Sequence, residues 1–156
     1  MKLQRNLLLA AAAVAILSAT VALAGSPKVF GEGVSDGDAV KISKIMEDPE
    51  SWVGKTVKIE GPVVFVCKHR GKSIDLASDE EFEQLKVMMD PGTFPMELMG
   101  KKAVAEGELK VRQLSMEETE SYLEHESEAH GGAHDPDEVD GPLRLYYIEG
   151  KGVEVR

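Results

Sequence analysis

Two glycine-punctuated stretches constrain the fold more than any other feature of this sequence. The first stretch consists of Gly54-Lys55, four further residues and Glu60-Gly61. The second has the same pattern, with Gly100-Lys101, four further residues and Glu106-Gly107. Both stretches run into a two-residue alternation of apolar and charged side chains, which is typical of a β-strand with one buried face. A glycine inside such a strand marks a bend or a close backbone approach. The echo therefore predicts two long, bent strands of the kind that close a barrel, and we prefer this to a duplication because nothing outside the strands repeats.

The remaining alternation predicts a small, mainly β domain around these two strands. We expect five strands with short helices near 43–48 and 115–126; the strands fall near 55–67, 73–77, 84–89, 101–112 and 143–155. Ser115 and Glu118 form a capping-box pair at the start of the second helix. We interpret the pattern as a five-stranded Greek-key barrel of the OB type.

The first 24 residues have the features of a signal peptide. Lys2 and Arg5 precede an apolar run at 7–17, and Ala22-Leu23-Ala24 provides small residues at the positions that signal peptidase reads. We expect cleavage before Gly25 and a periplasmic or secreted product with no stable membrane anchor; the alternative is an uncleaved anchor. Residues 25–37 then form a flexible leader, and 38–156 form the OB-type domain.

Charge and cysteine content exclude several classes of protein. The 156 residues carry 18 basic and 28 acidic side chains, a net charge of −10, and one cysteine. An acidic chain is a poor nucleic-acid binder, because Lys and Arg must neutralise phosphates. One cysteine permits neither an internal disulfide framework nor a zinc site with several thiolates from one chain.

The order of several short motifs resembles a known family. The motifs are the run from Glu47 to Val63, then Val66-Cys67 and Gly71, Gly100-Lys101, Leu114 to Glu118, Gly141-Pro142 and Gly152 to Val155. Their order and spacing are similar to those of the exported bacterial OB-fold family catalogued as a domain of unknown function (number 4920). The resemblance covers nearly all of 30–156 and implies an exported OB barrel without an established activity. One departure is that Lys72 and Ser73 follow Gly71, where family members carry a second cysteine and an aromatic residue.

The segment 115–140 is the main candidate for a binding site. It contains ten carboxylates, no Lys or Arg, and three of the four histidines, His125, His130 and His134. Imidazole with carboxylate suits Zn or Cu, and Gly131-Gly132 would let two imidazoles converge on one ion. The alternative is a solvated, mobile insertion, because so charged a segment cannot bury an apolar core of its own.

Cys67 and His69 are the second candidate pair. Their spacing places both side chains on one face of an extended strand, a plausible half-site for Zn or Cu. The alternative is a buried cysteine followed by an exposed turn histidine.

These observations predict an exported, non-enzymatic OB-fold binding module, with a transition metal as candidate ligand. The alternative hypotheses are an interaction or envelope-assembly adaptor that holds another protein on the barrel face, and a thiol redox accessory protein acting through Cys67.

Overall fold

The computed structural model describes residues 27–68, 71–130 and 141–156. In chain order its elements are β1 (Lys28–Gly31), α2 (Ile42–Glu47), η1 (Pro49–Trp52), β2 (Thr56–Val66), β3 (Ser73–Ala77), β4 (Gln84–Met88), η2 (Met96–Leu98), β5 (Lys102–Gln113), α3 (Met116–His130) and β6 (Arg144–Val155). None of the helices in these ranges is long and apolar enough to cross a membrane.

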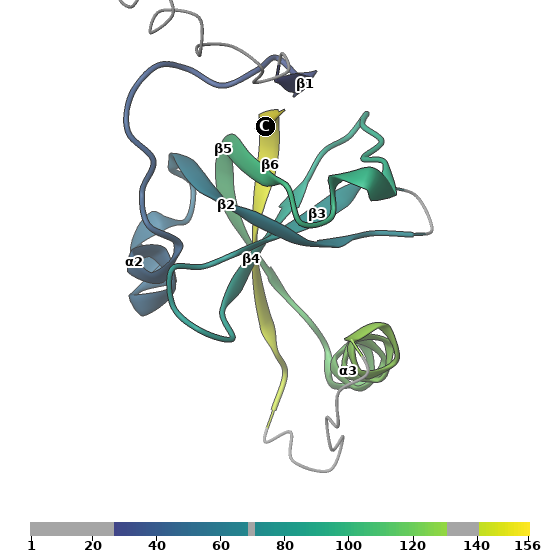
Figure 1. Cartoon of the computed structure of the whole chain (residues 1–156). Helices are drawn as coiled ribbons and strands as arrows, with labels where there is room; N and C mark the ends of the chain where they lie inside the picture. The colour runs from purple at the N-terminus through teal and green to yellow at the C-terminus, as the bar shows by residue number, and fades with distance from the viewer. Residues whose placement is uncertain (1–26, 69–70, 131–140) are drawn as a thin grey trace, which may run out of the picture.

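Strands β2 to β6 close into the predicted barrel. Going round it, the order is β2, β3, β4, β6, β5 and back to β2, and every pairing is antiparallel except the parallel one between β4 and β6. In Figure 1 the helix α2 lies to one side of the barrel, and α3 lies below it on the opposite side. The mainly β, five-stranded OB-type barrel expected from the alternation is confirmed.

The two echoed glycines lie where backbones come too close for a side chain. A Cβ on Gly61 would lie 2.3 Å from the Ala77 carbonyl oxygen, and one on Gly107 would lie 2.2 Å from that of Glu149. The register of β2 against β3 shifts between Val63 and Phe65, just beyond Gly61.

The core is the inward face of the alternating strands. Its largest fully buried side chains are Ile42, Ile45, Ile59, Ile74, Leu76, Leu85, Leu98, Leu109, Ile148, Val63, Val66 and Val87. Two of them, Ile42 and Ile45, come from α2, so this short helix contributes directly to the core. Burial of this apolar surface is the main stabilising contribution to a domain of this size.

The expected flexible leader is held against the barrel over its described part. Residues 28–31 form β1, which pairs antiparallel with the end of β6. Further along, the backbone N–H and hydroxyl of Ser35 both donate to Glu106 (2.8 and 2.7 Å), and these bonds lower the pKa of Glu106. Lys58 Nζ donates to the Gly37 carbonyl (2.9 Å). Main-chain pairing and these polar bonds fix a segment whose composition alone indicated a loose chain.

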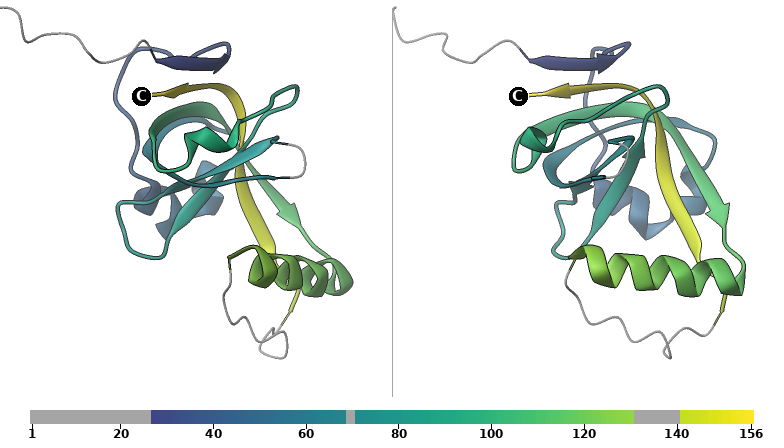
Figure 2. Two further views of the ribbon diagram at one scale, coloured as in Figure 1. Left: turned by 45° about the vertical axis from the view of Figure 1, so that its right-hand side comes forward. Right: turned by 90° about the vertical axis from the view of Figure 1, so that its right-hand side faces the viewer.

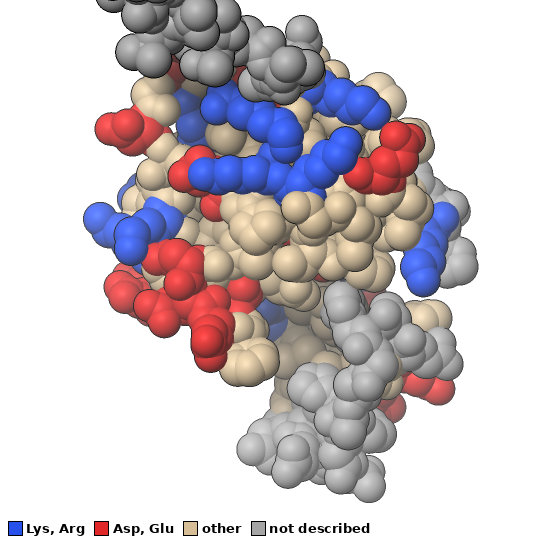
Figure 3. Space-filling view, in the orientation of Figure 1, with Lys and Arg blue, Asp and Glu red and all other residues tan. Residues whose placement is uncertain are grey.

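Charge is unevenly distributed over the surface. In Figure 3, Lys and Arg form a band across the upper part of the face, over β5 and β6, while Asp and Glu gather at the lower left over α2 and the β3–β4 connection. Charge is therefore not spread evenly over the face that Figure 3 shows.

Candidate binding groove

The described residues do not assemble the metal site expected from the histidines. His69 and His134 lie outside the described residues, as does the side chain of His130, the last residue of α3. His125 is exposed on α3, and Cys67 is half-buried after the end of β2. Within the described ranges, no three His, Cys, Asp or Glu side chains are grouped as metal ligands.

The capping box predicted for α3 is confirmed and sets where this helix begins. The Ser115 N–H donates to Glu118 Oε2 (2.9 Å), and the Glu118 N–H donates to Ser115 Oγ (3.2 Å). Glu118 also accepts from Arg112 on β5 (2.6 Å). These bonds lower the pKa of the Glu118 carboxyl. The bond from the Ser115 N–H has the largest effect, and the bond from Arg112 has the next largest.

Among the side chains of α3 that the structure describes, few apolar ones fix the helix to the barrel. Leu123 and Thr119 are buried, and Leu114 is buried just before the helix. Thr119 Oγ1 donates to the Ser115 carbonyl (2.7 Å) and accepts from the Leu143 N–H (3.0 Å), which ties the helix to the start of β6. Figure 2 shows α3 lying along the barrel beside the lower ends of β5 and β6.

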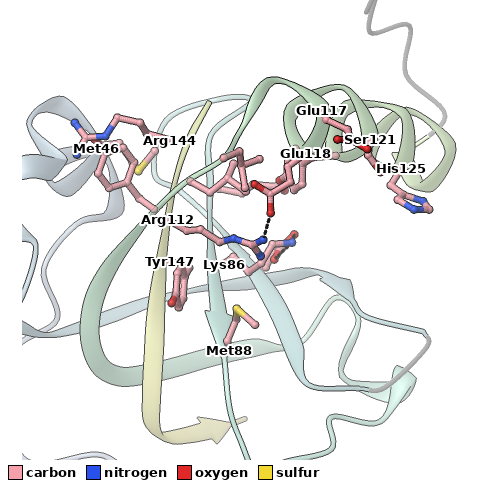
Figure 4. A pocket seen from close by; sticks show the side chains of 16 residues that line it. Met46, Lys86, Met88, Arg112, Glu117, Glu118, Ser121, His125, Arg144 and Tyr147 are labelled. Atoms are coloured by element: carbon pink, nitrogen blue, oxygen red, sulfur yellow. Dashed lines mark hydrogen bonds and ion pairs between the residues drawn. The ribbon is translucent and has the colours of Figure 1, made fainter. Parts of the chain in front are cut away.

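A groove lies between α3 and the outer face of the barrel. It has a volume of about 890 Å³, and its lining comprises Met46, Asp75, Gln84, Lys86, Met88, Arg112, Leu114, Glu117, Glu118, Ser121, Tyr122, His125, Arg144, Leu145, Tyr146 and Tyr147. Figure 4 shows Ser121 and His125 on the helical side, with Lys86, Met88 and Tyr147 on the barrel side. Apolar walls with a few convergent polar groups are typical of ligand pockets, which measure about 300–1,000 Å³.

Three adjacent strands supply a polar row within the groove. Asp75 on β3 is opposite Lys86 on β4, which is opposite Tyr147 on β6. The carboxylate of Asp75 is buried and lies 3.3 Å from Lys86 Nζ. Lys86 Nζ also lies 5.7 Å from the centroid of the Phe65 ring, a cation–π distance. The ammonium group is thus held in place by an anion and by an aromatic face.

The two arginines of the groove are also held by carboxylates. Arg112 binds Glu118 across the gap between β5 and α3, as the dashed line in Figure 4 shows. Arg144 forms an ion pair with Glu50, which also accepts a hydrogen bond from the Tyr146 hydroxyl. That hydrogen bond raises the pKa of Tyr146. Each of the three cations of the groove therefore has a carboxylate of this chain beside it.

Sequence reasoning missed most of this groove. Among the predicted metal-site residues whose side chains are described, His125 is the one that lines the groove. Lys86, Arg112 and Tyr147 occupy outward positions of alternating strands, where charged and polar residues are ordinary. The one available signal was the sequence position of α3 between the last two strands, because the loop between these strands contributes to ligand binding in OB barrels.

Comparisons with known proteins add no assignment. No protein-family model matches the chain, and no curated protein matches it. The resemblance to the exported OB-fold family stays a prediction based on the motifs quoted above.

Proposed function

We propose that this chain is an exported, non-enzymatic OB-type binding module that holds its ligand in the groove between α3 and the barrel. The groove itself is the observation that supports this. It has a volume of about 890 Å³, and aromatic, apolar and charged side chains from four strands and two helices line it. A binding role fits the commitment of Lys86, Arg112 and Arg144 to ion pairs, which orient these groups and leave their charge balanced.

The groove favours a partner held on the barrel face over an isolated metal ion. Among the predicted ligands whose side chains the structure describes, His125 is the one that lines the groove, and a tetrahedral zinc site needs about four ligands. A Zn or Cu site through His125, His130, His134, His69 and Cys67 therefore stays a separate hypothesis, tested below. The thiol redox hypothesis has the least support, because the one cysteine of the chain has no second thiol to exchange with.

Export remains part of the proposal through the signal-peptide pattern of residues 1–24, which lie outside the described ranges. N-terminal sequencing of protein purified from its native source tests it. We expect a chain that begins at Gly25 outside the cytoplasm, and an intact Met1 on a cytosolic product contradicts the prediction.

Binding in the groove can be tested with two neighbouring positions on α3. Ser121 lines the groove and Glu120 does not, while both are exposed. Ser121→Trp should fill the groove without disturbing the core, and Glu120→Trp adds the same ring outside the groove. An amide NMR titration of the mature protein with a neutral oligosaccharide (maltohexaose), short linear peptides and Zn(II) in separate samples provides the readout.

We expect at least one of these probes to shift the amide signals of Lys86, Arg112 and Tyr147. Those shifts should disappear in Ser121→Trp and persist in Glu120→Trp. If every probe leaves the groove amides unmoved, or if binding survives the tryptophan at position 121, the groove is not the binding site.

A further inference from the structure

One edge of β6 is open where the strand passes through the groove. Along one side β6 pairs with β5 from Arg144 to Val155. On the other side it pairs with β4 at 147–149 and with β1 at 152–155. Within the described ranges no strand covers this second edge at 144–146, and all three of these residues line the groove.

The hydrogen-bond pattern indicates which main-chain groups point to the open edge. The Leu143 carbonyl accepts from the Leu114 N–H (2.9 Å), so Leu143 turns its carbonyl toward the β5 side. Main-chain groups alternate between the two edges along an antiparallel strand. The N–H and C=O of Arg144 therefore turn to the open edge, where another strand would find both a donor and an acceptor.

Side chains beside this edge suit an extended polypeptide. Leu145 and Tyr147 line the groove from the same strand, and Met88 lines it from β4. An added strand gains affinity from main-chain hydrogen bonds and specificity from alternate side chains in flanking pockets. Apolar and aromatic surfaces alongside the edge provide such pockets.

Charge in the groove argues against a phosphate-bearing polymer. Lys86 is paired with Asp75, Arg112 with Glu118 and Arg144 with Glu50, while Glu117 adds a further negative charge to the lining. Binding of single-stranded nucleic acid needs a positively charged groove that follows the backbone. A polypeptide recognised through its main chain needs no such excess.

We propose that the ligand of the groove is an extended polypeptide segment that adds as a strand to the open edge of β6 at Arg144–Tyr146. This inference rests on the proposed binding function of the groove and assigns it a ligand class and a binding mode. The added segment would follow the line of β4 and contact α3 on its other side.

The probe is a linear peptide of about eight residues, which is within the usual range of strand lengths. A phage-displayed library is selected on the mature protein, with depletion on the Ser121→Trp variant so that peptides binding elsewhere are removed. The enriched peptide is synthesised and titrated calorimetrically. Analogues with a methyl group on one backbone nitrogen at a time then report which N–H groups of the peptide are used.

If the peptide adds as a strand, the effect of backbone methylation on affinity should alternate along it. Methylation at every second residue along the segment that lies on the edge should weaken binding about tenfold, the size of effect expected from losing one hydrogen bond, and the intervening positions should tolerate it. The Arg144 amide should also exchange with solvent more slowly in the complex. Uniform tolerance of methylation, or unchanged exchange at Arg144, overturns the inference.

Failure of the inference can be told apart from failure of the proposed function. If maltohexaose shifts the groove amides and no peptide is enriched on the wild-type protein, the groove binds a ligand but the ligand is not a polypeptide strand. If an enriched peptide binds Ser121→Trp and wild type equally, both proposals fall. If nothing binds and the groove amides stay unmoved, both fall as well.

Discussion

The barrel and the helix α3 are held by different kinds of interaction. The barrel is built on buried apolar side chains and on glycines at which strands nearly touch, as at Gly61 and Gly107. Over its described side chains, helix α3 is placed by a capping box, by the Arg112–Glu118 ion pair, by the bonds of Thr119 and by one buried leucine, Leu123. A framework fixed by apolar burial resists local change, whereas a helix fixed by a few contacts can shift without unfolding the domain. One wall of the groove is therefore rigid and the other is adjustable.

The sharpest test of this comparison removes one leucine from each region. Leu109 of β5 is fully buried in the core, and Leu123 is the buried leucine of α3. Leu109→Ala should lower the free energy of unfolding by about 3 kcal/mol, because it leaves a cavity in a packed core. Leu123→Ala should have a smaller global effect and should mainly speed amide exchange in α3. Equal losses in chemical denaturation would show that helix and barrel unfold as one unit.

A glycine substitution tests the close approach in the barrel. Gly107→Val places a side chain against the Glu149 backbone and should cost about 2 kcal/mol or more. Gly61→Val should behave similarly, since its Cβ would overlap the Ala77 carbonyl. The control is Gly141→Val, because no heavy atom of the described residues lies within 4 Å of its Cβ position. Wild-type melting temperatures in the first two variants would contradict this account of the bent strands.

The link between α3 and β6 depends on one hydroxyl group. Thr119→Val keeps the volume of the side chain but removes the acceptor for the Leu143 N–H, at a cost of about 1 kcal/mol. We expect faster amide exchange at Leu143 and along the first turns of α3, with the barrel unchanged. Ser127→Ala is the matched control, because its hydroxyl donates only within the helix, to Glu124. A similar response in both variants would mean that Thr119 does not tie α3 to the barrel.

Acid should loosen the start of α3 through Glu118. The pKa of this carboxyl is lowered in the folded state, so its ion pair and capping bonds stabilise the helix above the ordinary glutamate pKa of about 4.3 and are lost as the pH falls below it. NMR shifts of the Ser115 and Glu118 amides between pH 7 and pH 3 report the change. The Glu118→Gln variant cannot titrate there, so a pH response that persists in it rules out Glu118 as the cause.

Metal binding should alter the difference between the barrel and α3 less than any of the changes above. If the histidines of 125–140 hold Zn(II) or Cu(II), binding weakens in acid, because protons compete with the metal for the imidazole nitrogens. Replacing His130 and His134 together with Ala should then remove most of the affinity, with a smaller effect from Cys67→Ser. Calorimetric titration of the mature protein measures both, and an unchanged double variant rejects this ligand set.

Sequence patterns determined the barrel because their physical causes are local. A two-residue alternation around Val57 and Ile59 has one physical outcome, a strand with one buried face, and the capping box of Ser115 and Glu118 needs only four consecutive residues. The pairing of β1 with β6 was not predicted from the sequence, because it joins residues more than 100 positions apart. The composition of the chain near β1 does not indicate that this segment pairs with β6.

Only the tertiary structure decided the groove. Lys86 and Tyr147 are 61 positions apart in sequence and become neighbours through the parallel pairing of β4 with β6 that closes the barrel. Each occupies an outward position that, read alone, indicates an ordinary solvated face. The placement of α3 over that face turns the outward row into the floor of a groove. Several elements together form the groove, so no single segment of the sequence encodes it.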